Sequence, residues 1–157
     1  MQILALTRYD QLGASSRIRF YGYDSYFLRE GVKVSYSPLI KKHLLEKKYL
    51  KGRYPFSHLC CSYLYRFLYI LFFSRKFDII WVEKELFPGL PTFVESLFFV
   101  IFKKVILDYD DSVHLNYHKA WPGSHKKIEK LMSQADLVFV GSPYLEKTAK
   151  LAGAKFI

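Results

Sequence analysis

The alternation of short apolar runs with longer segments of helical periodicity constrains the fold more than any other feature of this sequence. Five runs have the length and composition of β-strands in a covered sheet; they are Gln2–Thr7, Val32–Ser37, Asp78–Val82, Lys104–Asp108 and Asp136–Gly141. Helical patterns lie between or after them, chiefly at Phe56–Arg75, Pro91–Lys103, Ser124–Ala135 and Ser142–Gly153. This order predicts an α/β fold, a doubly wound parallel sheet with helices on both faces.

The two ends of the pattern carry further expectations. The first helix is expected to begin at Ser15 or Ser16 as its N-cap and to stop at Gly31. Its predicted apolar face consists of Phe20, Tyr23, Phe27 and Leu28. At the other end, "AKFI" (154–157) has the composition of a strand that has just begun. We therefore expect a chain cut from a longer protein; the alternative is a sheet completed in an unusual way.

The length and charge of the chain limit its organisation and its partners. Its 157 residues suffice for one domain and not for two ordinary ones, so residues 1–157 are expected to form a single domain. A net charge of +10 favours anionic partners. Six Lys and Arg crowd Lys41–Arg53 beside one Glu; this segment is either a solvated connection or a patch that touches anionic lipid, with the adjoining aromatic side chains at the interface. No nucleic acid partner is expected, because no recognition-helix or RNA-binding pattern is present.

The cysteines and the longest apolar stretch bear on location. Cys60 and Cys61 are adjacent, and a disulfide between neighbours would be badly strained. This favours a reducing, cytoplasmic compartment. Both cysteines lie in Leu59–Phe73, an apolar stretch of fifteen residues interrupted by Arg66. We interpret it as a buried or interfacial helix and not as a membrane span; the N-terminal run is too short for a signal peptide.

Candidate ligand contacts follow the first strand, because parallel sheets bind ligands at the carboxyl ends of their strands. The loop there contains Gly13, Ala14, Ser15 and Arg17. Backbone N–H groups at a helix N-terminus, approached past small side chains, form an anion site to which Arg17 can add a forked contact. The alternative is an ordinary turn in which the serines cap the helix, and a single glycine does not decide between the two.

Acidic side chains follow the third and fourth strands. Glu83 and Glu85 come after the third, and Asp110 and Asp111 come after the fourth. Neighbouring carboxylates repel one another and raise one another's pKa values, so we expect a bound ligand to offset this repulsion. Sugar hydroxyls fit this need, because carboxylates accept hydrogen bonds from them; metal fits less well, since no ligand spacing is evident. A capping role for Asp110 or Asp111 stays open, as does a plain loop role for His114.

Four stretches together resemble the N-terminal domain of the retaining "group 1" glycosyltransferases, family four of the GT-B fold. They are "ILALTRYDQLGASSRIRFYGY", "DIIWVEKELFPGLP", "ILDYDDSV" and "ADLVFVGSPYLEKTAKLAGA", in the family's order and spacing. The likeness covers nearly the whole chain apart from residues 41–57. It implies the Rossmann-like N-terminal half of a two-domain fold, in which the C-terminal half, absent from this chain, holds most of the sugar nucleotide.

The resemblance also implies site residues. The implied contacts to the donor diphosphate are Gly13, Ala14, Ser15 and Arg17. The implied acceptor contacts are Glu83, Glu85, Asp110, Asp111 and His114, and Ser142 would line the cleft. Many family members have two adjacent glycines in the first loop, where this sequence has only Gly13.

The implied function is retaining transfer of a hexosyl group from a sugar nucleotide to a glycan or lipid-linked acceptor, in cell-envelope polysaccharide or glycolipid synthesis. The resemblance implies no cofactor and no obligatory metal. It also implies no protein nucleophile, because the donor phosphate helps to deprotonate the acceptor. We expect this chain to be inactive by itself, and to lie in the cytoplasm or peripherally on the inner face of the membrane. The alternative is a non-catalytic Rossmann-like module that binds a phosphorylated ligand or a partner protein.

Overall fold

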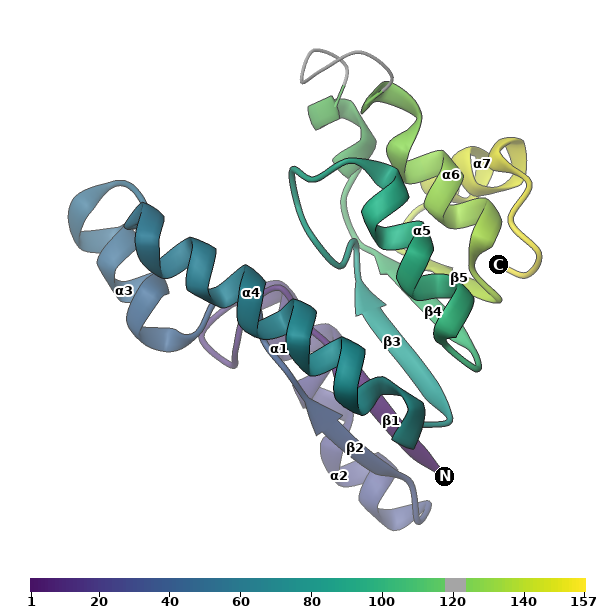
Figure 1. Ribbon diagram of the computed structural model, residues 1–157. Coiled ribbons are helices and arrows are strands. Elements are labelled where there is room, and N and C mark those ends of the chain that lie inside the picture. The colour runs from purple at the N-terminus through teal and green to yellow at the C-terminus, as the bar shows by residue number, and fades with distance from the viewer. Residues whose placement is uncertain (118–123) are drawn as a thin grey trace. The chain divides into compact units, whose positions relative to one another are not determined.

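The computed structural model describes residues 1–117 and 124–157, with the backbone alone at residues 51, 114, 116 and 125. All five expected strands are present, as β1 (Gln2–Leu6), β2 (Lys33–Tyr36), β3 (Ile79–Glu83), β4 (Val105–Tyr109) and β5 (Leu137–Val140). They form one parallel sheet in the order β2-β1-β3-β4-β5, flanked by helices (Figure 1). This confirms the predicted α/β, Rossmann-like doubly wound fold.

The chain divides into two compact units, Met1–Asp78 and Ile79–Ile157. In the first unit, β1 pairs with β2 from Gln2 opposite Lys33 to Ala5 opposite Tyr36. Its helical elements are α1 (Ala14–Arg19), η1 (Tyr21–Tyr23), α2 (Asp24–Arg29), α3 (Lys42–Lys51), α4 (Phe56–Phe73) and η2 (Ser74–Lys76). Figure 1 shows α4 in front of the two strands and α1 and α2 behind them, so helices cover both faces of this pair.

The second unit is built around the other three strands. β4 pairs with β3 on one side, Leu107 lying opposite Val82, and with β5 on the other, opposite Val138. These three central residues are fully buried. The helical elements are α5 (Thr92–Ile101), η3 (Val113–Tyr117), η4 (Ser124–Lys126), α6 (Lys127–Gln134) and α7 (Pro143–Ala152). α6 packs against both α5 and α7.

The first helix differs from the expectation. Gly13, and not Ser15 or Ser16, is its N-cap, and the helix breaks after Arg19 into the 3-10 turn η1 and then α2. Gly22 lies inside η1, and glycine is a poor helix former, which accounts for the break. Because the axis changes there, the predicted apolar face does not form: Phe20 is buried, whereas Tyr23 and Leu28 are exposed. Gly31 does follow the end of α2, at φ +67°.

The C-terminal "AKFI" does not form the expected strand. The carbonyl oxygen of Phe156 accepts a hydrogen bond from the Val138 N–H at 2.9 Å, but no ladder continues from this contact. The side chain of Phe156 is exposed.

The apolar stretch forms the long helix α4, which is more exposed than a core helix. Arg66 and Ile70 are its buried residues. Together with η2 it makes one segment, Phe56–Lys76, that is long and apolar enough to cross a membrane by length and composition. The helix begins at Phe56, as the predicted range Phe56–Arg75 has it, and Arg75 lies in the 3-10 turn that follows.

Candidate functional site

The acidic pair after β4 is held by a lysine that follows β3. Lys84 Nζ lies 2.7 Å from Asp110 Oδ1 and 2.5 Å from Asp111 Oδ2. The Lys84 side chain is 7% exposed, that of Asp110 is 25% exposed and that of Asp111 is 67% exposed. The two carboxylates therefore share one buried cation and still present their outer surfaces to solvent, most of all at Asp111.

Lys84 has an unusual backbone conformation. Its φ is +66°, a left-handed value that costs a side-chain-bearing residue about 1–2 kcal/mol. Its N–H donates to the carbonyl oxygen of Asp108 at 2.9 Å, which continues the β3–β4 ladder by one residue. Burial by itself lowers the pKa of Lys84, but the hydrogen bonds to Asp110 and Asp111 outweigh it and raise that pKa above its ordinary value. The lysine is therefore charged at neutral pH.

The end of β5 lies against the same place. Gly141 N–H donates to the Tyr109 carbonyl oxygen at 2.8 Å, and a Cβ added at Gly141 would lie 3.3 Å from the Cα of Asp110. The small residue thus lets the β5–α7 turn approach the acidic pair closely. Ser142 comes next and caps α7, its hydroxyl accepting a hydrogen bond from the Leu145 N–H at 3.3 Å. The carboxyl ends of β3, β4 and β5 therefore meet around Lys84 and Asp110.

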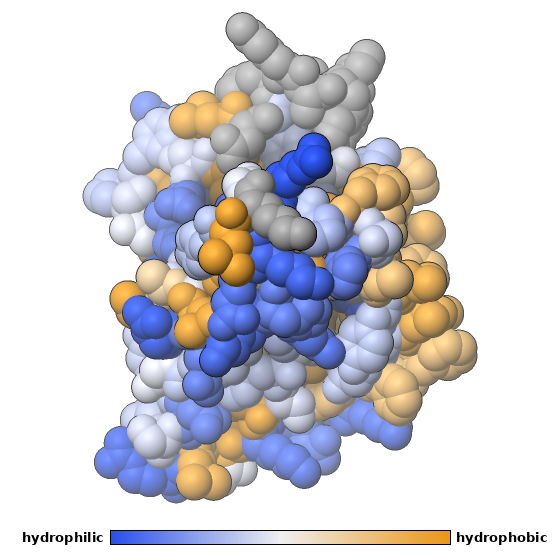
Figure 2. All heavy atoms as spheres, turned by 90° about the vertical axis from the view of Figure 1, so that its left-hand side faces the viewer, coloured by the Kyte–Doolittle hydropathy of each residue, from blue (hydrophilic) through white to orange (hydrophobic). Residues whose placement is uncertain are grey.

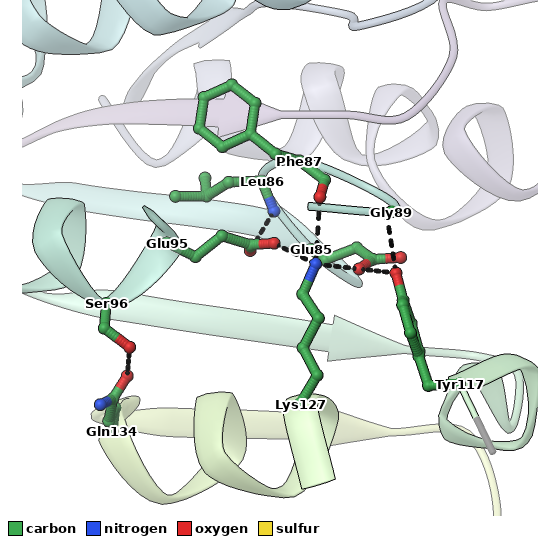
Figure 3. A network of polar contacts seen from close by, with 9 residues as sticks. All are labelled: Glu85, Leu86, Phe87, Gly89, Glu95, Ser96, Tyr117, Lys127 and Gln134. Atoms are coloured by element: carbon green, nitrogen blue, oxygen red, sulfur yellow. Dashed lines mark hydrogen bonds and ion pairs between the residues drawn. The ribbon is translucent and has the colours of Figure 1, made fainter. Parts of the chain in front are cut away.

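Glu83 and Glu85, predicted beside the acidic pair, are buried, at 2% and 4% exposure. Glu85 belongs to a separate polar network, in which Lys127 Nζ lies 2.8 Å from Glu85 Oε2 and 2.6 Å from Glu95 Oε1 (Figure 3). The Tyr117 hydroxyl also donates to Glu85 Oε2, at 2.5 Å. The Glu85 carboxylate is therefore engaged by two side chains of its own unit.

This network fixes the loop after β3. Lys127 Nζ donates to the Phe87 carbonyl oxygen at 3.0 Å, Glu95 Oε2 accepts from the Leu86 N–H at 2.7 Å, and the Tyr117 hydroxyl accepts from the Gly89 N–H at 3.0 Å. Figure 3 shows Lys127 reaching up from the start of α6 to the centre of these groups. These three hydrogen bonds fix the loop's backbone at Leu86, Phe87 and Gly89, directly after Lys84.

Burial dominates the electrostatics of the network. It raises the pKa of Glu95, a rise that Glu85 strengthens and Lys127 opposes. Burial likewise raises the pKa of the Tyr117 phenol, with Glu85 adding to the effect, so that this hydroxyl remains a donor at any ordinary pH. The sequence patterns did not single out Lys127, Glu95 or Tyr117, because these side chains come together only when η3, α5 and α6 pack around the loop after β3.

The loop after β1, in the first unit, is shaped by Tyr9. A Cβ added at Gly13 would lie 2.3 Å from the Tyr9 Cβ, and the Ser16 hydroxyl accepts a hydrogen bond from the Tyr9 N–H at 3.1 Å. Arg17 is exposed, and its Nη1 donates to the Gln11 carbonyl oxygen at 3.3 Å. Packing against Tyr9 is thus a sufficient reason for the glycine.

Replacing Gly13 by alanine is expected to lower the free energy of unfolding by about 1–3 kcal/mol, because the new methyl group overlaps Tyr9 and the loop must shift. Chemical denaturation followed by circular dichroism measures the loss. Ala14→Ser, at the exposed next position, is the control. A Gly13→Ala protein as stable as this control would show that the contact with Tyr9 relaxes freely.

Three further points concern His114, metal binding and the likeness to known proteins. The backbone of His114 belongs to η3, and its side chain lies outside the described residues. Among the side chains that the structure describes, which leave out those of His114 and His125, no three His, Cys, Asp or Glu gather in a group that could hold a metal ion. Comparison of the sequence with protein-family models and with curated proteins finds no significant match.

Proposed function

We propose that the chain is the N-terminal, acceptor-side domain of a retaining sugar-nucleotide-dependent glycosyltransferase that acts in the cytoplasm on a glycan or lipid-linked acceptor. The observation that carries the proposal is the cluster of Asp110, Asp111 and Lys84 at the carboxyl ends of β3 and β4. Open parallel sheets bind ligands at this edge. The ion pairs with one buried lysine restrain both carboxylates, and their exposed oxygens are then oriented to accept hydrogen bonds from sugar hydroxyls.

In this proposal the chain binds the acceptor, and the C-terminal domain that the family resemblance implies binds most of the sugar nucleotide. Asp110 and Asp111 bind and orient the acceptor, and Lys84 positions them. Glu83 and Glu85 are not given acceptor contacts in this proposal, because both are buried and Glu85 holds the loop that carries Lys84. Gly13, Ala14, Ser15 and Arg17 remain the proposed approach to the donor diphosphate, where the exposed Arg17 would stabilise negative charge on the leaving group.

The test is transfer by the complete gene product with Asp111→Asn and, separately, Asp110→Asn. Loss of one hydrogen bond to a charged group costs about 1.5–3 kcal/mol, so we expect kcat/KM for the acceptor to fall about ten- to a hundredfold. The KM for the sugar nucleotide should stay unchanged. Glu146→Gln, which removes a partly exposed carboxylate in an ion pair on α7, is the matched control.

Two results would contradict the proposal. One is wild-type transfer by both Asn variants when their thermal stability is also wild-type. The other is turnover of a sugar nucleotide by the 157-residue chain alone, because the proposal places most donor contacts in a further domain. A non-catalytic module would bind a phosphorylated ligand without turnover in either form, and the two Asn substitutions would leave that binding intact.

A further inference from the structure

The positive charge of the chain is concentrated in its first unit. Residues 1–78 contain fourteen Lys and Arg against five Asp and Glu, a net charge of +9. Residues 79–157 contain ten against nine, a net charge of +1. A partner that is attracted by charge will therefore be attracted to the first unit.

Within this unit, α3 and α4 form a hairpin with a small core of its own. Gly52, in a left-handed conformation, ends α3 and lets the chain turn toward α4. The hairpin core is a buried cluster of Leu39, Ile40, Leu44 and Leu45, packed against the partly buried Tyr9, Tyr54, Leu59 and Tyr63. The hairpin is thus already stabilised by these buried side chains.

The tip of the hairpin carries large apolar side chains that this core does not use. Tyr49 is 76% exposed, Leu50 is 84% exposed and Phe56 is 81% exposed. Transfer of each of these side chains from water to an apolar environment would contribute about 1.5–3 kcal/mol to binding. The fold leaves them in solvent, which is typical of a surface that meets a partner.

The outer face of α4 continues this apolar surface. Leu64, Leu68, Leu71 and Phe72 follow a helical spacing of four, three and one residues, and all are exposed. We call them the outer stripe. In Figure 2 hydrophobic side chains gather along the right-hand side of the view, the side on which α4 lies. The helix contains no acidic residue.

Cations border the tip and both ends of the stripe. Lys47, Lys48 and Arg53 lie around the tip, and Arg75 and Lys76 follow α4 in η2. Lys48 Nζ lies over the Tyr54 ring, 5.1 Å from its centroid, so this charge makes a cation–π contact at the base of the tip. An apolar strip with basic borders has the chemistry of an interfacial segment on an anionic membrane.

A hollow between the two helices has the same mixed character. It has a volume of about 340 Å³, and its lining includes Lys41, His43 and His58 beside the apolar Leu39 and Tyr65. A lining that combines positive or hydrogen-bonding groups with apolar ones suits a phosphate-bearing lipid headgroup.

Arg66 distinguishes lying on a membrane from crossing it. Its Nη2 donates to the Thr7 carbonyl oxygen at 2.5 Å and to the Ser37 carbonyl oxygen at 2.6 Å, and the side chain is 1% exposed. These bonds fasten the middle of α4 to the ends of β1 and β2. A spanning helix would have to break both and place the guanidinium in hydrocarbon, where a charge is strongly disfavoured.

We propose that the α3–α4 hairpin docks this chain on an anionic membrane surface, with Tyr49, Leu50 and Phe56 inserted between headgroups and the outer stripe lying along the interface. A second copy of the chain is a poorer occupant, because two units of net charge +9 repel each other. The proposal does not depend on the transferase function: membrane binding and sugar transfer are measured separately, and either can fail alone.

The experiment is sedimentation of the 157-residue chain with vesicles of phosphatidylcholine, with or without phosphatidylglycerol. We expect binding to the anionic vesicles only, release by salt, and release by alkaline carbonate, which strips peripheral but not spanning proteins. The triple substitution Tyr49→Ser, Leu50→Ser and Phe56→Ser should weaken binding about a hundredfold or more. The double substitution Lys41→Gln and Arg53→Gln should weaken vesicle binding about fivefold for each charge removed.

Matched controls in the second unit should leave binding unchanged. They are Tyr144→Ser with Leu151→Ser for exposed apolar side chains, and Lys126→Gln with Lys147→Gln for exposed charges. Equal binding to both kinds of vesicle, binding to neither, or wild-type binding by the triple variant would overturn the proposal. So would resistance to carbonate, or a stable dimer in solution that the triple variant converts to monomer.

Discussion

Replacement of Lys127 by methionine is expected to lower the free energy of unfolding of Ile79–Ile157 by about 3–5 kcal/mol, because it leaves the carboxylates of Glu85 and Glu95 buried without their shared cation. The two tryptophans of the chain both lie in this unit, so denaturation followed by their fluorescence reports on it selectively. Lys126→Met, at the exposed neighbouring position, should change stability by no more than about 0.5 kcal/mol.

The loss should depend on pH in a defined direction. Burial already raises the pKa of Glu95 in the folded state, and removing Lys127 removes a group that lowers it. A folded-state pKa above the unfolded value means that the folded state binds more protons, so stability falls as pH rises through that window and recovers as pH falls. We expect Lys127→Met to differ less from the wild type at about pH 5 than at about pH 8. A pH-independent difference would show that the lost charge is not what destabilises the variant.

Arg66→Met is expected to destabilise Met1–Asp78 by about 3 kcal/mol or more, because two hydrogen bonds from a charged group disappear and leave the buried carbonyl oxygens of Thr7 and Ser37 without this donor. Amide hydrogen exchange in β1 and β2 locates the loss in this unit, and circular dichroism gives its size. Arg75→Met, which removes an exposed arginine in η2, is the control. Unchanged exchange in both strands would mean that water or another group replaces the guanidinium at no cost.

The strands were predictable because their physics is local. Each is a short apolar run bounded by polar residues. No observed strand end differs from the expected one by more than one residue. The first helix was not predictable in the same way. The helical spacing of its apolar residues continues across Gly22, although the helix breaks there. "AKFI" was mistaken for a strand because its composition suits one, whereas the structure gives it a single ladder-like hydrogen bond, at Phe156.

The candidate site was only partly predictable, because ion pairing is not local. The sequence placed Asp110 and Asp111 at a strand end, but Lys84, which forms an ion pair with each, precedes Asp111 by 27 residues. Lys84 does stand immediately after a strand, and a basic residue at such a position is the signal that could have identified it. Nothing comparable marks Lys127, whose partner Phe87 is 40 residues away. Partners of this kind emerge only when helices are placed on a sheet.

The bonds of Arg66 also bear on the order in which the first unit folds. Its two acceptors lie 59 and 29 residues earlier in the chain, and they come together only when β1 and β2 have paired. Until that pairing exists, the guanidinium has no prepared site and α4 gains little by docking. Contacts between residues so distant in sequence form slowly, since a long loop must first close. We therefore expect α4 to dock on the strands late in folding. Until it docks, both faces of this apolar helix, including Arg66, are accessible to chaperones and to lipid.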